Sequence, residues 1–492
     1  MSRSRREVLI SGGVIGAGLV GADFSILDAL AGPPPPKRVS LATLSMTDPL
    51  LETYRDAVKI MQAKPASDKF NWTNLCYIHG NETDYHFCPH GDWYFLPWHR
   101  AYVVTYEKAI RNLTGNNDFA FPYWDWFANP KLPDQFTAPT VNGQANPLYV
   151  AARTWPANTP MPSTIVGPSV QTAVMAATPF ESFGTTRNPA QNSLDQSWVP
   201  EGGGFQGELE KTPHNQIHNN IGGFMPYSNS PMDPIFFMHH ANIDRIWAVW
   251  NHNGNANSSD PLWTGMTFEN NFLNPDGTSW SPKVSDLYVP ENLGYTYGLG
   301  IPLLAAKNLV LEENKFIQLM KYLKNPGGPV EGLRVFEAAT ATIAATHLVL
   351  PVRVESSLVE SVRRAKRPPQ GANIHLLQET RAANTRVLAL ISNVSATKPR
   401  NAEYRVFLNA KSPSPETPVS DPHYVGSFAI FDHSMTRGRH KMPSFSIDLT
   451  DAVQRVGEGG DLNVQIVPVP IRKGESAGTV TAEKVQIAFL TP

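Results

Sequence analysis

The apolar pattern of the 492-residue chain changes at one point, and this change constrains the fold more than any other feature. Before the Pro- and Gly-rich run Asn325–Pro329 the apolar residues recur at helical spacing, and after it they alternate with polar residues. A period of two is typical of strands that bury one face. The alternating sets are Tyr404, Val406 and Leu408; Phe445, Ile447 and Leu449; Val464 and Ile466; and Val485, Ile487 and Phe489. We therefore predict a mainly α domain followed by an all-β, sandwich-like domain.

The first part of the chain has the signals of helices joined by long loops. Apolar spacing and flanking breakers predict helices over residues 48–63, 97–113, 212–220 and 234–250. Asp48 is the expected N-cap of the first. Residues 125–210 are rich in Pro, Asn, Gln and Thr, which predicts long loops. We expect one domain at residues 37–325, which holds the chemistry, and a β-rich domain at 330–492.

Residues 1–36 have the composition of an export signal followed by a Pro-rich linker. Ser4–Ile10 resembles the twin-arginine motif, and a mild apolar run follows it. The G-x-G-x-x-G spacing of Gly16–Gly21 does not indicate a dinucleotide site, because neither a preceding strand nor a βαβ unit is expected there. We expect a bacterial protein that is periplasmic or secreted, without a stable membrane span after leader removal. A disordered or membrane-anchoring tail is the alternative.

The charge balance of the chain limits the classes of molecule that it can bind. A formal net charge of −2 and a pI near 6.7 provide no basic field for nucleic acid or for an anionic membrane. With 41% apolar and 10% aromatic residues, the chain can bury a large core. A small, neutral substrate fits this balance best, and the composition predicts no particular oligomeric state.

Six histidines in two clusters predict a metal centre. The clusters are His79, His90 and His99, and His214, His218 and His240. The step of four between His214 and His218 places both imidazoles on one helix face. Neutral imidazole suits copper, zinc, iron and nickel, and three nitrogens for each ion leave positions open for a substrate or oxygen. The H-E-x-x-H motif of zinc proteases does not fit, because Asn215 follows the first histidine.

The residues around these histidines resemble the type 3 copper family, which comprises tyrosinases, catechol oxidases and molluscan hemocyanins. His90–Arg100 carries an H-x8-H-R signature and Asp233–Asp244 a D-P-x-F-x-x-x-H-x-x-x-D signature, with H-N-x-x-H between them. Phe121–Trp126 is similar to the aromatic segment after the first copper site, and Leu293–Tyr297 to the Y-x-Y element that closes the catalytic domain. The resemblance implies a four-helix bundle that holds two copper ions, Cu A and Cu B, with O2 as co-substrate.

Carried over residue by residue, the resemblance implies a ligand set. It places His79, His90 and His99 on the first copper and His214, His218 and His240 on the second. His86 is the alternative to His79, and His239 is expected to pack against the site rather than to bind metal. Cys88 and His90 lie in a C-x-H segment similar to the one that fungal tyrosinases and molluscan hemocyanins join by a thioether. This thioether would leave Cys76 unpaired, and a Cys76–Cys88 disulfide or two free thiols are the alternatives.

Four further residues have roles by the same resemblance. Glu210 corresponds to a glutamate that orients a water, and Asn215 to an asparagine that cooperates with it, for the removal of the proton of a monophenol. Glu208 is a competing candidate, and a solvated loop glutamate is the alternative for Glu210. Tyr227 falls where relatives carry a gating residue. Asp244, one turn beyond His240, is expected to accept an imidazole N–H or to pair with an arginine.

The implied activity is that of a tyrosinase or polyphenol oxidase, which uses O2 to hydroxylate monophenols and to oxidise o-diphenols to o-quinones. His423–Phe431 resembles a segment of the β domain that covers the coppers in hemocyanins and latent polyphenol oxidases, so we expect a lid and a zymogen. A structural appendage is the alternative. The basic residues at 363–367 are either a cleavage site or a solvated face. A catechol oxidase without monophenolase activity, an O2 carrier and a non-copper hydrolase are the rival functions, and a copper chaperone is left open as a partner.

Overall fold

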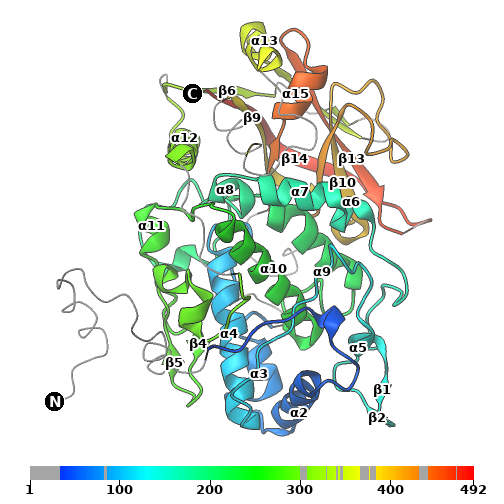
Figure 1. Cartoon of the computed structure of the whole chain (residues 1–492). Helices are drawn as coiled ribbons and strands as arrows, with labels where there is room; N and C mark the ends of the chain where they lie inside the picture. Colours follow the sequence, from blue (N-terminus) through cyan, green and yellow to red (C-terminus); the bar gives the residue numbers. More distant parts are fainter. Residues whose placement is uncertain are drawn as a thin grey trace, which may run out of the picture.

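The computed structural model describes residues 34–81, 86–299, 307–327, 330–338, 342–343, 347–365, 376, 384–431, 442–472 and 474–491. Most of the expected leader and linker, residues 1–33, and the basic residues Lys366 and Arg367 lie outside these ranges. The described chain forms a helical part and a β-rich part that meet along a border lined by short helices (Figure 1). Among the described residues, no helix combines the length and the apolar character needed to cross a bilayer.

Four helices build the helical part, as predicted. They are α2 (Pro49–Ala63), α4 (Phe95–Thr114), α9 (Asn215–Ile221) and α10 (Ile235–His252). The Asp48 side chain caps α2 by accepting the Leu50 N–H at 2.9 Å. Gly115 ends α4 with a φ of 72°, a conformation that favours glycine. The start of α9 differs from the prediction, because Glu210–His214 forms a π-helical turn around Pro213.

The long loops predicted over residues 125–210 contain short helices that the sequence did not predict. Four helices interrupt them: α5 (Asp134–Thr137), α6 (Ser163–Val166), α7 (Pro168–Ala176) and α8 (Phe180–Phe183). Pro168 occupies the first turn of α7, and its buried residues Val174 and Met175 lie close together rather than at a regular helical period. A window search for periodicity therefore misses such short helices. Other short elements are α3 (Trp72–Cys76), α11 (Pro261–Thr264), β1 (Thr140–Val141), β2 (Gln144–Ala145), β4 (Phe272–Leu273) and β5 (Ser279–Trp280).

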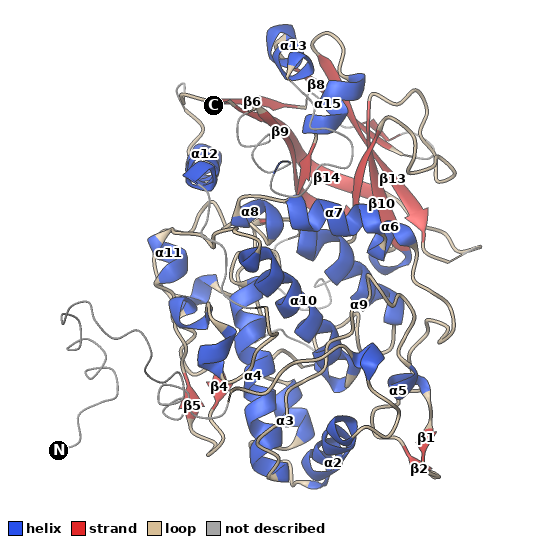
Figure 2. Cartoon of the chain, viewed as in Figure 1, coloured by secondary structure: helices blue, strands red, loops and turns tan. Residues whose placement is uncertain are grey.

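The β-rich part is a sandwich of two five-stranded sheets (Figure 2). The first sheet has the order β11 (Tyr424–Phe428), β10 (Ala402–Leu408), β13 (Asp461–Pro470), β8 (Leu348–Arg353), β7 (Thr342–Ile343). The second has the order β3 (Phe205–Gln206), β12 (Ser444–Asp448), β9 (Arg386–Ala396), β14 (Val480–Leu490), β6 (Leu333–Glu337). The alternating sets predicted from the sequence lie in or next to β10, β12, β13 and β14. The remaining helices of this part are α13 (Ser356–Arg364) and α15 (Thr450–Val456).

Strand β9 lacks the alternating pattern because both of its faces are buried. Val387, Ala389 and Ile391 face the interior of the sandwich, while Leu388 and Leu390 face a second cluster that contains helix α12 (Lys307–Lys324). A strand buried on both faces has a continuous apolar run instead of a period of two.

The two parts share a sheet, which the sequence did not predict. Strand β3 comes from the helical part but pairs in parallel with β12, so that Phe205 lies opposite Ser444 and Gln206 opposite Phe445. The β-rich part is therefore completed by residues that lie only a few positions before Glu210 and His214.

Candidate metal centre

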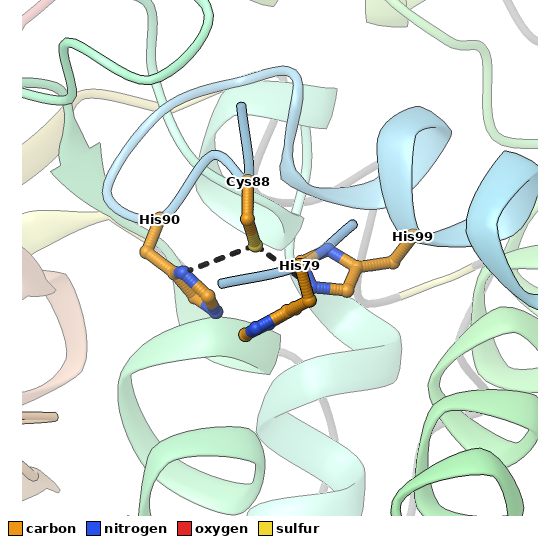
Figure 3. A group of neighbouring side chains, drawn as sticks. All are labelled: His79, Cys88, His90 and His99. Atoms are coloured by element: carbon orange, nitrogen blue, oxygen red, sulfur yellow. Dashed lines mark hydrogen bonds between the residues drawn. The ribbon is translucent and has the colours of Figure 1, made fainter. Parts of the chain in front are cut away.

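The first histidine cluster lies where α3, α4 and the turn between them meet (Figure 3). His99 is on α4, as predicted, but His79 follows α3 in a turn and His90 lies in the bend before α4. His79 and His90 therefore lie outside the helices, unlike His99. The bend at His90 depends on Gly91, whose φ of 63° favours glycine.

The second cluster is built by the π-helical turn, α9 and α10. His214 ends the turn, His218 follows one turn later on α9, and their ring centroids are 4.6 Å apart. The Nε2 atoms of His218 and His240 approach to 3.2 Å. His240 stacks on His99 of the first cluster at 4.4 Å, with 10° between the rings. The two clusters thus form one continuous centre.

Carbonyl oxygens orient three of these imidazoles. The Nδ1 atoms of His79, His99 and His218 lie 2.6, 2.8 and 2.7 Å from the carbonyls of Ser228, Phe95 and Met225. A carbonyl only accepts, so each Nδ1 carries the proton and each Nε2 presents a lone pair. This arrangement is the usual one for histidines that bind metal through Nε2.

Burial keeps the imidazoles neutral. It lowers the pKa of His99 to about 3 and that of His218 to about 4, and it lowers the pKa values of His214 and His240 well below the ordinary range. Neutral rings can donate lone pairs at pH 7. The Nε2 of His214 is buried and has no hydrogen-bond partner among the described residues. The donor set therefore fits two copper ions, which accept imidazole nitrogen.

The structure separates His79 from its alternative His86. His79 is completely buried and shares a cluster with Cys88, His90 and His99, whose potential ligand atoms all lie within 4.8 Å of one another. His86 is exposed, with its Nε2 3.2 Å from the Asn81 amide nitrogen.

His239 was expected to pack against the site, but it lies among the potential ligands of the second site. It joins His214, His218 and His240 in a group whose ligand atoms lie within 4.8 Å. Its Nδ1 accepts the Trp126 Nε1–H at 3.2 Å, so the neutral ring carries its proton on Nε2. This tautomer presents an N–H to the centre rather than a lone pair, which distinguishes His239 from His79, His99 and His218.

The two cysteines occupy separate places. Cys88 Sγ lies 3.5 Å from His90 Nδ1 and 3.4 Å from His99 Nε2 (Figure 3). Cys76 is buried elsewhere, 3.2 Å from both the Tyr106 hydroxyl and the Pro231 carbonyl. Both thiols are free, and burial raises the pKa of each. The structure therefore contains no Cys76–Cys88 disulfide.

Glu210 is a buried carboxyl group beside the first cluster. Its Oε1 accepts the Gly91 N–H at 2.7 Å, and the Thr185 hydroxyl donates to its Oε2. Burial outweighs these two hydrogen bonds and raises the pKa of Glu210 to about 8. The competing candidate Glu208 lies instead at the border between the two parts, 2.5 Å from Lys211 Nζ.

Asn215 is fully buried and orients His214. Its Oδ1 lies 2.9 Å from His214 Nδ1, and its Nδ2 donates to Gln206 Oε1 at 2.8 Å and to the Ala429 carbonyl at 3.0 Å. Ala429 belongs to the C-terminal part, so residues of both parts reach this amide. The contribution of Gln206 had no signal in the spacing of the sequence.

Asp244 pairs with arginines rather than with an imidazole. Its carboxylate lies 2.5 Å from Arg100 Nε and 2.8 Å from Arg38 Nη1, and it accepts the hydroxyls of Tyr295 and Tyr297, each at 2.7 Å. Burial opposes ionisation, but the two guanidinium groups hold the pKa of Asp244 below its usual range. Asp244 thereby ties α10 to α4 and to the residues that follow the linker.

Tyr227 is 38% exposed, with the Arg400 guanidinium 4.1 Å from its ring centroid. It directly precedes Ser228, whose carbonyl lies 2.6 Å from His79 Nδ1, and its role as a gate stays a prediction.

Phe95 and Phe236 of the helical part lie against the histidines, and Phe431 of the C-terminal part joins them. The Phe431 centroid lies 4.8 Å from His218, 5.2 Å from His90 and 5.9 Å from His214. The resemblance pointed to the segment His423–Phe431 as a cover but did not single out this side chain.

A strip of the C-terminal part leads to Phe431. Residues 427–431 run along the π-helical turn and α9, joined by three hydrogen bonds besides the one to Asn215. These are Thr212 Oγ1 to the Ser427 carbonyl at 2.7 Å, Ala429 N–H to the Lys211 carbonyl at 2.8 Å, and Asn219 Nδ2 to the Ile430 carbonyl at 3.0 Å.

Comparison with known proteins agrees with this architecture. Residues 69–253 match the common central domain of tyrosinase, and residues 368–489 match the chloroplastic polyphenol oxidase C-terminal domain. A tyrosinase from Hahella sp. (strain CCB-MM4) is 24% identical, over 90% of this chain and 97% of the relative. Chloroplastic polyphenol oxidase II of Ipomoea batatas is also 24% identical, over 93% of this chain and 77% of the relative.

Solved structures show the same fold. A latent aurone synthase (polyphenol oxidase) superposes with a TM-score of 0.62 at 18% identity, over 93% of this chain and 90% of the other. Latent apple tyrosinase superposes with a TM-score of 0.61 at 20% identity, over 94% and 98%. With both its central and its C-terminal segments matched and with two clusters of neutral, buried histidines, the chain belongs to the type 3 copper family of tyrosinases and polyphenol oxidases, as a copper-dependent oxidoreductase of that class.

Proposed function

We propose that this enzyme hydroxylates monophenols and oxidises o-diphenols to o-quinones, and that its C-terminal domain keeps it latent. The observation that carries the proposal is the Phe431 ring, buried among His90, His214 and His218. A phenylalanine side chain is a benzene ring, so it fills the space that the ring of a small phenol needs. When bound, the two copper ions exchange electrons with dioxygen and with the phenol. The six histidines hold them: His79, His90 and His99 on one, and His214, His218 and His240 on the other.

The protein groups supply orientation and proton transfer. A bound phenol is enclosed by the buried rings around Phe431, which exclude water from the reacting hydroxyl. Glu210 orients a water that takes the proton of this hydroxyl, because this carboxyl group reaches the His90 bend through Gly91. Asn215 acts with it and fixes His214. An o-diphenol is more acidic and more easily oxidised, so its reaction depends less on Glu210. A catechol oxidase without monophenolase activity is the second candidate.

The lid is the domain at residues 330–492, and the catalytic domain is at residues 37–325. Lid opening must break the three hydrogen bonds of the strip 427–431, the Asn215 contact and the β3–β12 pairing. It must also break four further hydrogen bonds between the two parts, which are Lys211 Nζ to the Ser446 carbonyl, Thr164 to Glu403, Arg386 to the Thr178 carbonyl and Arg472 to Thr154. Cleavage near the basic residues at 363–367 would leave the lid held by these contacts.

We also propose a thioether between Cys88 and His90. The sulfur lies 3.5 Å from the His90 ring nitrogen, close enough for a bond to a ring carbon after a small rotation. The reaction joins Sγ to carbon, removes the thiol hydrogen and the ring hydrogen as protons, and passes two electrons to dioxygen. The bond would fix the orientation of an imidazole that lies outside any helix. We further propose that the leader exports the protein to the periplasm or the exterior. The substrate is a small phenol.

The test compares full-length, copper-loaded protein before and after mild lid disruption, with O2 uptake and quinone formation as readouts. We expect little turnover of a catechol or a monophenol before disruption and turnover of both after it. Catechol oxidation alone would support the second candidate. Reversible O2 binding without quinone would support an O2 carrier and contradict the proposal. Equal activity before and after disruption would contradict latency.

A further inference from the structure

The Asn215 amide is the point where the C-terminal domain meets the second metal site. The Ala429 carbonyl can only accept a hydrogen bond, so the amide atom facing it at 3.0 Å is the nitrogen Nδ2. The oxygen Oδ1 must then face His214 Nδ1, at 2.9 Å. His214 therefore keeps its proton on Nδ1 and directs the Nε2 lone pair toward the second site. A flipped amide would face His214 with an N–H and favour the opposite tautomer.

Gln206 provides the second acceptor for the same Nδ2 group. Its Oε1 lies 2.8 Å from Asn215 Nδ2, and the side chains of Gln206, Asn215 and His214 are all buried. Gln206 also lies against the bend of the first site, because a Cβ atom added at Gly91 would be 3.6 Å from its Nε2. Its backbone is part of β3, opposite Phe445 of the lid. Gln206 thus contacts the supports of both metal sites and the lid.

We propose that Gln206 is a positioning residue. It holds the Asn215 amide in one orientation and thereby fixes the tautomer of His214, and it does so alone when the lid opens. In the closed enzyme Asn215 Nδ2 has two acceptors, Gln206 and Ala429. Opening removes Ala429 together with its strip and leaves Gln206. The inference rests on the proposed lid, and it predicts that the importance of Gln206 increases on opening.

The first experiment needs no opening. Gln206→Met retains the length of the side chain and removes the acceptor, whereas Gln206→Glu retains an acceptor. In the full-length copper-loaded Met variant, we expect copper to leave the second site for a chelator roughly tenfold faster, with release from the first site unchanged and with Glu restoring slow release. Nitrogen NMR of metal-free protein labelled at histidine should show partial loss of the Nδ1–H tautomer of His214. Unchanged release, or equal acceleration at both sites, would overturn the inference.

The second experiment tests the link to the lid in the full chain. Phe431→Ala is the opened background, and hydrogen exchange at the Ala429 N–H, which donates to Lys211 in the closed state, reports opening. In this background we expect Gln206→Met to accelerate copper release from the second site by roughly 100-fold. The same factor in both backgrounds would overturn the link. Protection of Ala429 in Phe431→Ala would count against the proposed latency, while the first experiment still decides the role of Gln206.

Discussion

Phe431→Ala tests the plug at the site. The ring is fully buried and lies within 6 Å of three of the proposed copper ligands. Truncating a buried phenylalanine typically costs about 3–5 kcal/mol. Because this ring is buried only while the lid is closed, most of that cost falls on the closed state. At about 1.4 kcal/mol for each factor of ten, the equilibrium between closed and open lid shifts by roughly 100- to 4,000-fold toward open.

The assay is quinone formation from a catechol by the full-length, copper-loaded variant without proteolysis or detergent. We expect activity in Phe431→Ala and little in the wild type. Phe489→Ala is the matched control, since Phe489 is equally buried but lies in the sandwich core against Phe336. General loosening of the lid would activate both variants. A Phe431→Ala variant that stays inactive until the lid is removed would show that Phe431 does not block the site.

Three further predictions concern single side chains. Glu210→Gln should slow monophenol hydroxylation by roughly 100- to 10,000-fold in the opened enzyme and largely spare catechol oxidation. Glu208→Gln should leave the ratio of the two activities unchanged. An equal loss of both activities in Glu210→Gln would exclude a role in proton removal. Asp244→Asn should lower the free energy of unfolding by about 3–5 kcal/mol in denaturant titrations, because Arg38 and Arg100 lose their carboxylate. Folding lowers the pKa of Asp244, so the stabilisation is present above its unfolded pKa and is lost as the pH falls through the folded value. If the free energy of unfolding of the variant fell with decreasing pH as steeply as that of the wild type, this prediction would be contradicted. Copper-loaded protein exposed to oxygen should have an intact mass lower by two hydrogens, and Cys88→Ser should abolish the deficit; a mass equal to the sequence mass would exclude the thioether.

Local patterns in the sequence predicted the helices α2, α4, α9 and α10 and four strands of the sandwich, because each depends on neighbouring residues. They did not predict the 18-residue helix α12. Asp48 and Gly115 mark helix ends through their own caps, and the alternation in β10 and β13 reflects the apolar side chains that pack into the sandwich core. Strand β9 was not predicted, because a strand that is buried on both faces lacks the alternation of apolar and polar residues. The pairing of β3 with β12 joins residues more than 200 positions apart, which no local pattern encodes.

The residues of the metal centre that lie in local motifs could be predicted from the sequence. Those that distant segments contribute could not. The H-x8-H-R and D-P-x-F signatures locate the histidines, and the structure brings them together. By contrast, Phe431 and Gln206 reach the site only because the lid and the helical part share a sheet and a strip of hydrogen bonds. Tyr227 was chosen by its distance along the chain from His240; its ring contacts Arg400, and its role as a gate stays a prediction.

The most direct test of the proposed dicopper centre is the position of copper in the full-length, copper-loaded protein, located by anomalous scattering at the copper edge. We predict two peaks, one at the Nε2 atoms of His79, His90 and His99 and one at those of His214, His218 and His240, with the Phe431 ring beside them. A single copper, or a copper bound by His239 or by the thiolate of Cys88, would contradict it.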